Sequence, residues 1–283
     1  MKIALTFDVE RDPAITRILP RLLNILEDYN AVATYFITHD YGGYYTNHSG
    51  RIVEKFYEIV DKCSKLGEIG SHVHFRRKNG KFCVDYDFQR ELIENATNML
   101  REKGFNVKSF RGGDLYFDNN TLQILEKLGY ETDSSVSPLH FNKLSNNVFV
   151  DHKRVTNNKP YFPSKEDYCV SGDSTILEIP VTRFFFSPKI NFLSFSFSPC
   201  LDRVPGSGIS ILKVWWKLFN NTPIIILYHP FNFLTEAERK IHCFKNFIDD
   251  CRRSEIEFVT MQQINSQWRA HARLEMEGSG AIS

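Results

Sequence analysis

The chain has 283 residues, enough for one large α/β domain or two average ones. Hydrophobic residues make up 42% and charged residues 24%, as in an ordinary globular protein, and the net charge of +1 gives no field that would attract nucleic acid or an acidic membrane surface. No stretch reaches the roughly 18 apolar residues of a membrane helix, and the opening "MKIALTFDVERD" becomes charged too early for a signal peptide. With six scattered cysteines and no C-x-x-C pair, we expect a cytoplasmic protein without a transmembrane segment.

Short apolar runs alternate with longer amphipathic segments along the chain. The first run, "KIALTF", is typical of a buried strand, and the helical spacing after it contains Pro20, which marks an irregularity or a helix start. Strands are predicted over residues 2–7, 32–38, 68–73, 108–113, 131–136, 175–182, 223–229 and 256–261. Helices are predicted over residues 14–29, 52–67, 87–104, 119–129, 208–221 and 236–254. Gly67 is expected to end the second helix and Asp87 to cap the third. The stretch 137–173 gives little periodic signal.

Strands that alternate with helices pair in parallel, so this repeat predicts an α/β protein. Seven or eight such units fit either a barrel or a large doubly wound sheet. Because no glycine-rich phosphate loop follows the first strand, a dinucleotide-binding fold is disfavoured. We therefore predict a single irregular barrel over residues 1–265. Residues 266–283 are expected to form a disordered or vector-derived tail.

Ionisable residues follow several predicted strands at their carboxyl ends, where the chemistry of such barrels is found. Each has an ordinary structural explanation, since Asp8, for example, could cap the next helix. Those explanations do not require the residues to converge, whereas a barrel would gather them into one cleft. The residues are Asp8, Glu10, His72, His74, Arg111, Asp133 and His229.

The residue types in this set predict metal-assisted hydrolysis. One carboxylate and two imidazoles form the open three-ligand site that is typical of catalytic zinc. Since alternate residues of a strand point to the same face, Asp8 and Glu10 can face the cleft together, and so can His72 and His74. A second carboxylate can take a proton from water, and a histidine can protonate a leaving amine. An arginine beside the free carboxylate would keep it ionised.

Four motifs occur in the order of a known family. They read "LTFDVE", "GEIGSHVH", "FRGGDLYFDNNTLQILEKLGYETDSS" and "IIILYHP". From Lys2 to about Met261 the chain resembles the polysaccharide deacetylases, carbohydrate esterase family four, which share the NodB homology domain. The resemblance implies an irregular (β/α)7-type barrel, a divalent metal with zinc as the first expectation, and an atypical bacterial branch with D-x-E and H-x-H motifs.

The resemblance also implies a set of metal ligands. In the family's first motif a second aspartate binds the metal, but Val9 stands at that position here. Glu10 is therefore the expected ligand, as in branches that read D-x-E. The first histidine of the second motif matches His72. The family's second histidine should fall at position 76, which is Arg76, so His74 is the expected third ligand.

The acid and base of the reaction are assigned by the same resemblance. Asp8 matches the family's general base, and Arg111 matches the arginine that pairs with it. Asp133 matches the aspartate that tunes the acid histidine, and His229 matches the general acid itself. Gly113 stands where the family has a proline.

The expected reaction is metal-dependent removal of an N-acetyl or formyl group from an amino sugar in a saccharide or a saccharide precursor. Two alternatives stay open: hydrolysis of a non-sugar, cyclic amide, and an inactive barrel that serves as a carbohydrate-binding or scaffold protein. The expected partner is a saccharide or a lipid- or nucleotide-linked sugar, and not nucleic acid. The aromatic segments 184–199 and 211–219 fit a substrate groove or a peripheral membrane contact, as well as simple packing.

Overall fold

The computed structural model describes residues 1–11, 13–38, 50–183, 208–218 and 222–279. In 50–53, 208–211, 215 and 273–279 only the backbone is described. The aromatic segment 184–199, a candidate for substrate or membrane contact, lies outside the described residues. Within the described part of the chain, no helix is both long enough and apolar enough to cross a membrane.

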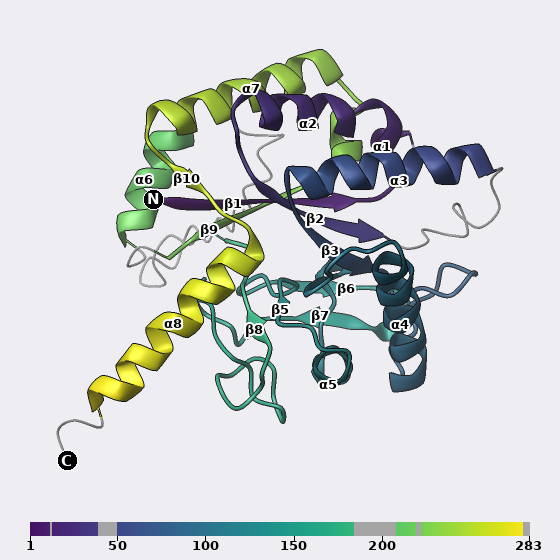
Figure 1. Ribbon diagram of the computed structural model, residues 1–283. Coiled ribbons are helices and arrows are strands. Elements are labelled where there is room, and N and C mark those ends of the chain that lie inside the picture. Colours follow the sequence, from purple (N-terminus) through teal and green to yellow (C-terminus); the bar gives the residue numbers. More distant parts are fainter. Residues whose placement is uncertain (12, 39–49, 184–207, 219–221, 280–283) are drawn as a thin grey trace.

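A curled parallel sheet lies at the centre of the molecule (Figure 1). Among the described residues it has eight strands in the order β10-β1-β2-β3-β4-β5-β8, and β9 pairs with β1. Beyond β8, the N–H of Thr182 donates to the carbonyl of Ile225 in β9 over 3.2 Å, which joins the two sides of the curl. The strands are β1 (Lys2–Val9), β2 (Ala33–Thr38), β3 (Gly67–Val73), β4 (Ser109–Gly112), β5 (Thr132–Asp133), β8 (Leu177–Glu178), β9 (Ile224–Tyr228) and β10 (Glu257–Phe258). The predicted α/β barrel is confirmed as a curled parallel sheet surrounded by helices.

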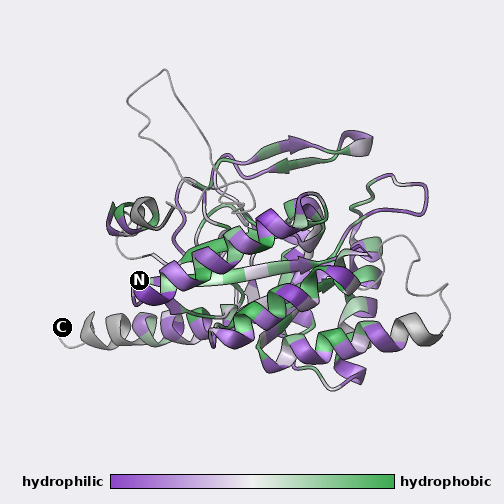
Figure 2. Cartoon of the chain, turned by 90° about the horizontal axis from the view of Figure 1, so that it is seen from above, coloured by the Kyte–Doolittle hydropathy of each residue, from purple (hydrophilic) through white to green (hydrophobic). Residues whose placement is uncertain are grey.

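Helices cover the outside of this sheet. Helices α2, α3 and α7 lie along one side of it, and α4 and α5 lie along another (Figure 1). Their bounds are α1 (Ala14–Arg17), α2 (Leu19–Asp28), α3 (Gly50–Lys65), α4 (Tyr86–Glu102), α5 (Asn119–Lys127), α6 (Gly208–Leu218), α7 (Ala237–Arg253) and α8 (Met261–Ser279). Pro20 lies in the first turn of α2, where its missing N–H has no partner to lose, so it marks a helix start. Hydrophobic and hydrophilic residues occur side by side on these helices (Figure 2), as expected of elements that pack against a sheet.

The strands are buried on both faces, as helices around a parallel sheet require. Every residue of β1 after Lys2 is buried, and so is every residue of β2. Within the hydrophobic core, the ring of Phe7 lies 5.5 Å from that of Tyr35 and 5.3 Å from that of Tyr228, measured between centroids. This packing ties β1 to its neighbours β2 and β9 and fixes where their carboxyl ends lie.

Two of the predicted helix ends are wrong. Gly67 does not end α3 but opens β3, and a Cβ atom there would lie 1.9 Å from the carbonyl oxygen of Ala33. Glycine is therefore needed for the close approach of β2 and β3, not for a helix cap. Asp85, not Asp87, caps α4, because its side chain accepts from the N–H of Phe88 over 3.0 Å.

The predicted tail from residue 266 is wrong for most of its length, because α8 continues to Ser279. Contacts with the body of the protein hold this segment. Arg269 donates to the carbonyl of Thr175 over 2.6 Å and lies over the ring of Phe162. Its helical pattern is weak in sequence, so tertiary contacts decide its structure. Residues 280–283 lie outside the described residues.

The stretch with little periodic signal contains a two-stranded antiparallel hairpin. It consists of β6 (Phe141–Lys143) and β7 (Phe149–Asp151) and follows β5 on the carboxyl side of the sheet. Figure 2 shows its two short strands at the edge of the molecule.

Candidate active site

The carboxyl ends of β1, β3, β4 and β9 bring the predicted ionisable residues together. In the register of the sheet, His72 of β3 lies beside Arg111 of β4. The last pair between β9 and β1 immediately precedes His229 and Asp8, so these two residues are neighbours as well. Asp8 is 2% exposed and Arg111 is 0% exposed. The site therefore lies inside the end of the sheet and not on a surface loop.

A cluster of Glu10, His72 and His74 lies at the centre of this end. One ligand atom from each residue lies within 4.8 Å of the other two. Nε2 of His74 is 2.8 Å from Oε2 of Glu10, and the two imidazole rings stand nearly at right angles with centroids 4.8 Å apart. One carboxylate and two imidazoles are the donor set of a three-ligand zinc site. The structure thus places together the three residues that the sequence predicts as ligands.

His72 presents a lone pair to this cluster. Its Nδ1 lies 2.9 Å from the carbonyl oxygen of Arg111, and because a carbonyl only accepts, Nδ1 carries the hydrogen. Burial lowers the pKa of His72 more than the carboxylate of Asp8 raises it, so the ring is neutral. Nε2 is therefore an acceptor, and it is buried with no hydrogen-bond partner among the described residues. It lies 3.8 Å from Oδ2 of Asp8. A buried acceptor that faces carboxylates fits a site that binds a cation.

His74 reaches the cluster because Gly113 has no side chain. A Cβ atom at Gly113 would lie 2.3 Å from Cγ of His74, far inside van der Waals contact. Gly113 is not among the residues with positive φ, so the requirement for glycine is one of space and not of backbone conformation. The glycine that replaces the family's proline is thus what makes room for the imidazole of the H-x-H motif.

Asp114 holds the other side of the His74 ring. Its Oδ2 lies 3.1 Å from Nδ1 of His74 and 3.1 Å from the guanidinium of Arg76. Burial opposes the charge of Asp114, but the hydrogen bond with His74 and the charge of Arg76 lower its pKa to about 2. A carboxylate on the second nitrogen of a histidine ligand fixes the orientation of the ring.

Sequence reasoning missed Asp114 as a partner of His74, because their contact spans two strand ends and follows no spacing rule. It also left Arg76 without a role at the position of the family's second histidine. In the structure Arg76 anchors Asp114 and lies over the ring of Phe82, with 4.1 Å between its guanidinium carbon and the ring centroid. Through Asp114, the arginine at position 76 thus supports the orientation of the His74 ring.

We expect Gly113→Ala to weaken divalent-metal binding by about 10- to 100-fold, because the new methyl group displaces the His74 ring. Isothermal titration of the metal-free protein measures this. The control is the same change in a His74→Ala background, where the methyl group has no ring to displace and should cost nothing further. An equal loss in both backgrounds would show that Gly113 acts through something other than His74.

Arg111 and Asp8 form a buried ion pair beside the cluster. Nη1 of Arg111 donates to Oδ1 of Asp8 over 3.0 Å and to the hydroxyl of Thr6 over 2.8 Å. The rest of the guanidinium donates to the carbonyl and the hydroxyl of Ser134 over 2.8 and 2.9 Å. Burial alone would raise the pKa of Asp8, but the imidazolium that His72 forms at low pH and the charge of Arg111 outweigh it and hold the pKa below its usual value. Asp8 is therefore an ionised carboxylate outside the three-residue cluster.

His229 follows the neighbouring strand β9 and faces Asp8 and Glu10. Its Nε2 lies 3.4 Å from Oδ2 of Asp8 and 3.8 Å from Oε1 of Glu10. The side chain is 23% exposed, whereas those of Asp8 and Glu10 are 3% exposed. A proton donor at this position can meet a substrate that enters from solvent while the carboxylates stay buried.

Asp133 is buried behind the site and contacts other groups than its predicted partner. Its carboxylate accepts from the N–H and the hydroxyl of Ser135 over 2.9 and 2.7 Å. It also lies beside the carboxyl of Glu178, and burial raises the pKa of both groups. Among the described residues no hydrogen bond joins Asp133 to His229, so the structure offers no support for a tuning role. The same carboxyl pair lies near Arg111, whose charge stabilises it.

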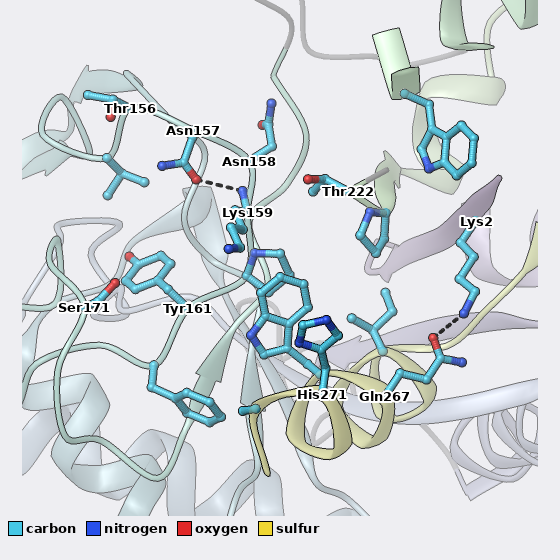
Figure 3. A pocket seen from close by; sticks show the side chains of 18 of the residues that line it. Lys2, Thr156, Asn157, Asn158, Lys159, Tyr161, Ser171, Thr222, Gln267 and His271 are labelled. Atoms are coloured by element: carbon cyan, nitrogen blue, oxygen red, sulfur yellow. Dashed lines mark hydrogen bonds between the residues drawn. The ribbon is translucent and has the colours of Figure 1, made fainter. Parts of the chain in front are cut away.

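A cavity of about 1090 Å³ lies away from this site, at the amino end of the sheet. It is lined by the start of the chain, the segment around Thr156–Tyr161 and the face of α8 that carries Gln267 and His271 (Figure 3). None of the predicted site residues lines it. Because the chemistry of parallel barrels lies at the carboxyl ends of their strands, this cavity is not the candidate active site.

The fold and the cluster define an α/β barrel with a candidate metal-binding site at the carboxyl ends of its strands. Residues 1–132 match the family model described as polysaccharide deacetylase, a range that includes Asp8, the three cluster residues and Arg111. Over these residues, which make up a little less than half of the chain, the sequence is similar to the polysaccharide deacetylase family. No curated protein matches the chain.

Solved structures share the fold at low sequence identity. A candidate polysaccharide deacetylase from Mycobacterium smegmatis is similar with a TM-score of 0.62 and 20% identity, over 96% of this chain and 91% of that one. The Bc1960 peptidoglycan N-acetylglucosamine deacetylase gives 0.50 and 16%, over 93% and 86%. A CE4 family pseudoenzyme from Bacillus anthracis gives 0.50 and 13%, over 93% and 65%. Since active and inactive proteins share this fold, the residues of the site must decide the activity.

Proposed function

We propose that the protein is a metal-dependent hydrolase that removes an N-acetyl or N-formyl group from an amino sugar. The observation that carries the proposal is the buried Nε2 of His72, which has no hydrogen-bond partner among the described residues, lies 3.8 Å from Oδ2 of Asp8 and shares one cluster with Glu10 and His74. Zinc is the proposed metal, because its catalytic sites combine imidazole and carboxylate ligands. A divalent metal held by the three residues would supply Lewis-acid polarisation of the acyl carbonyl oxygen.

The remaining residues supply the proton transfers. Asp8, held ionised by Arg111, accepts a proton from the water that attacks the acyl carbon. His229 donates a proton to the amine nitrogen as the C–N bond breaks, and its partial exposure suits contact with a bound sugar. The products are acetate or formate and a free amine, so the proton lost by water balances the proton gained by the amine.

The substrate class follows from the family and is proposed as an amino sugar within a saccharide or a lipid- or nucleotide-linked precursor. The inactive-barrel alternative is kept because a pseudoenzyme shares the fold. Against it stands the set at the strand ends, in which Asp8 contacts both Arg111 and His229, and the three candidate ligands lie within 4.8 Å of one another. No contact in the described residues favours a cyclic amide.

The proposal is tested by acetate and formate release from N-acylated amino-sugar oligomers. We expect release to stop after treatment with a chelator and to return with about one equivalent of zinc. A protein that binds the metal and turns over no acylated amine would be the inactive barrel. Turnover of cyclic amides alone would show that the substrate is not an amino sugar. Full activity after complete removal of the metal would show that the reaction does not depend on a metal.

A further inference from the structure

The β6–β7 hairpin carries an exposed face of aromatic and basic side chains. Alternate residues of a strand share a face, and the register places Lys143 opposite Phe149. Phe141 is 48% exposed and Phe149 is 44% exposed. Leu139, just before β6, is 42% exposed. These are three of the seven large hydrophobic side chains that are exposed among the described residues, so exposed apolar surface is concentrated here.

The two rings are arranged to present their edges more than their faces. Phe141 and Phe149 stack on each other with centroids 5.8 Å apart and 17° between their planes. The ammonium of Lys153 lies 4.2 Å from the centroid of Phe141, and that of Lys143 lies 5.8 Å from the centroid of Phe149. Each ring thus has a second ring and a cation against it, which leaves little free face for a sugar to stack on.

A strongly basic loop lies against the tip of this hairpin. The N–H of Phe82 donates to the hydroxyl of Ser145 over 2.9 Å, and the amide of Asn146 donates to the carbonyl of Phe82 over 3.0 Å. Segment 76–81 of the loop contains no acidic residue. Its basic residues are Arg76, Arg77, Lys78 and Lys81.

The positive charge of this region is only partly neutralised. Arg76 pairs with Asp114 and Arg77 with Asp85, and Lys153 pairs with Asp151. Within the described residues no ion pair involves Lys78, Lys81 or Lys143. Segments 76–81 and 139–153 together hold six basic residues and one acidic residue. The net charge of +1 for the whole chain therefore conceals a local excess of positive charge.

We propose that the hairpin and segment 76–81 dock on the surface of an anionic lipid bilayer. Exposed phenylalanine edges between lysines fit the boundary between headgroups and acyl chains, and the basic loop fits anionic headgroups. Segment 76–81 begins two residues after His74, so the docked surface adjoins the rim of the candidate active site. The inference goes beyond the proposed reaction and depends on neither the metal nor the substrate.

Sedimentation with phosphatidylcholine vesicles, with and without phosphatidylglycerol, tests this proposal on the full chain. We expect binding that requires phosphatidylglycerol. The double variant Phe141→Ser/Phe149→Ser should lose at least about tenfold in vesicle affinity, because two aromatic side chains no longer leave water. Lys78→Glu/Lys81→Glu should remove the dependence on phosphatidylglycerol.

Val214→Ser is the matched control, because Val214 is 57% exposed but lies on α6, away from the hairpin. It should bind vesicles like the parent protein, and all variants should keep the parent's unfolding temperature. The proposal is overturned if the parent does not sediment with anionic vesicles, or if the phenylalanine variant sediments equally well. Binding of a soluble glycan through the same phenylalanines, without vesicle binding, would also overturn it.

Discussion

Asp8→Asn is expected to lower the turnover number for deacetylation by at least about 100-fold, with metal binding retained. The amide cannot take a proton from water, and general base catalysis typically contributes about 10²- to 10⁴-fold. Metal binding should persist because Asp8 lies outside the cluster of Glu10, His72 and His74. Steady-state kinetics of acetate release and metal titration of the same preparation measure the two quantities.

The change also removes the carboxylate that neutralises Arg111, a buried guanidinium. Loss of one partner of a buried ion pair costs about 3–5 kcal/mol, so the unfolding free energy must be measured beside the kinetics. Asp61→Asn is the control, because Asp61 pairs with Lys65 on the exposed face of α3. If a folded Asp8→Asn protein turns over like the parent, Asp8 has no part in the reaction.

His72→Asn is expected to abolish both stoichiometric metal binding and activity. The variant loses the only nitrogen of residue 72 that points into the cluster, and two ligands hold a divalent ion far less tightly than three. We expect the dissociation constant for the metal to rise by more than about 100-fold. Loss of a residue that only orients a metal ligand typically costs about 10- to 100-fold in affinity, and His72 is itself a candidate ligand. Elemental analysis after dialysis, followed by titration with zinc, gives the answer.

His242→Asn serves as the matched control for this prediction. His242 is on α7, where it contacts Asn246, and it is not part of the cluster. It should bind the same amount of metal as the parent protein. Unchanged metal content in His72→Asn would mean that the ion is held elsewhere, and the assignment of the cluster would then be wrong.

The departures from the family's second and third motifs are best understood together. His74 stands two residues before the usual ligand position, Gly113 clears the space for its ring, and Asp114 holds its far nitrogen. Arg76, in the place of the missing histidine, anchors Asp114. Residues that look unrelated in sequence thus form one chain of neighbours in the structure, from Gly113 through His74 and Asp114 to Arg76, and they all support the position of one imidazole.

The elements of the fold were predictable where a local pattern is strong. Buried strands such as β1 and β2 and helices with a clear apolar face were predicted within a few residues of their observed bounds. The strand expected at 131–136 is shortened to two residues, because the carbonyl of Ser134 accepts from Arg111 instead of from a neighbouring strand. The segment after residue 265 was expected to be a tail, because its contacts with Thr175 and Phe162 have no signature in sequence.

The sequence by itself determined the parallel α/β architecture and the ionisable residues that end its strands, because both follow from local periodicity and from one rule of barrel geometry. It could not determine how those residues contact one another. The partnership of His74 with Asp114 and the space that Gly113 leaves for the His74 ring depend on distances between strand ends that are far apart in the chain. Only the tertiary structure decided these, because the curl of the sheet sets which side chains meet, and spacing along the chain does not encode that curl.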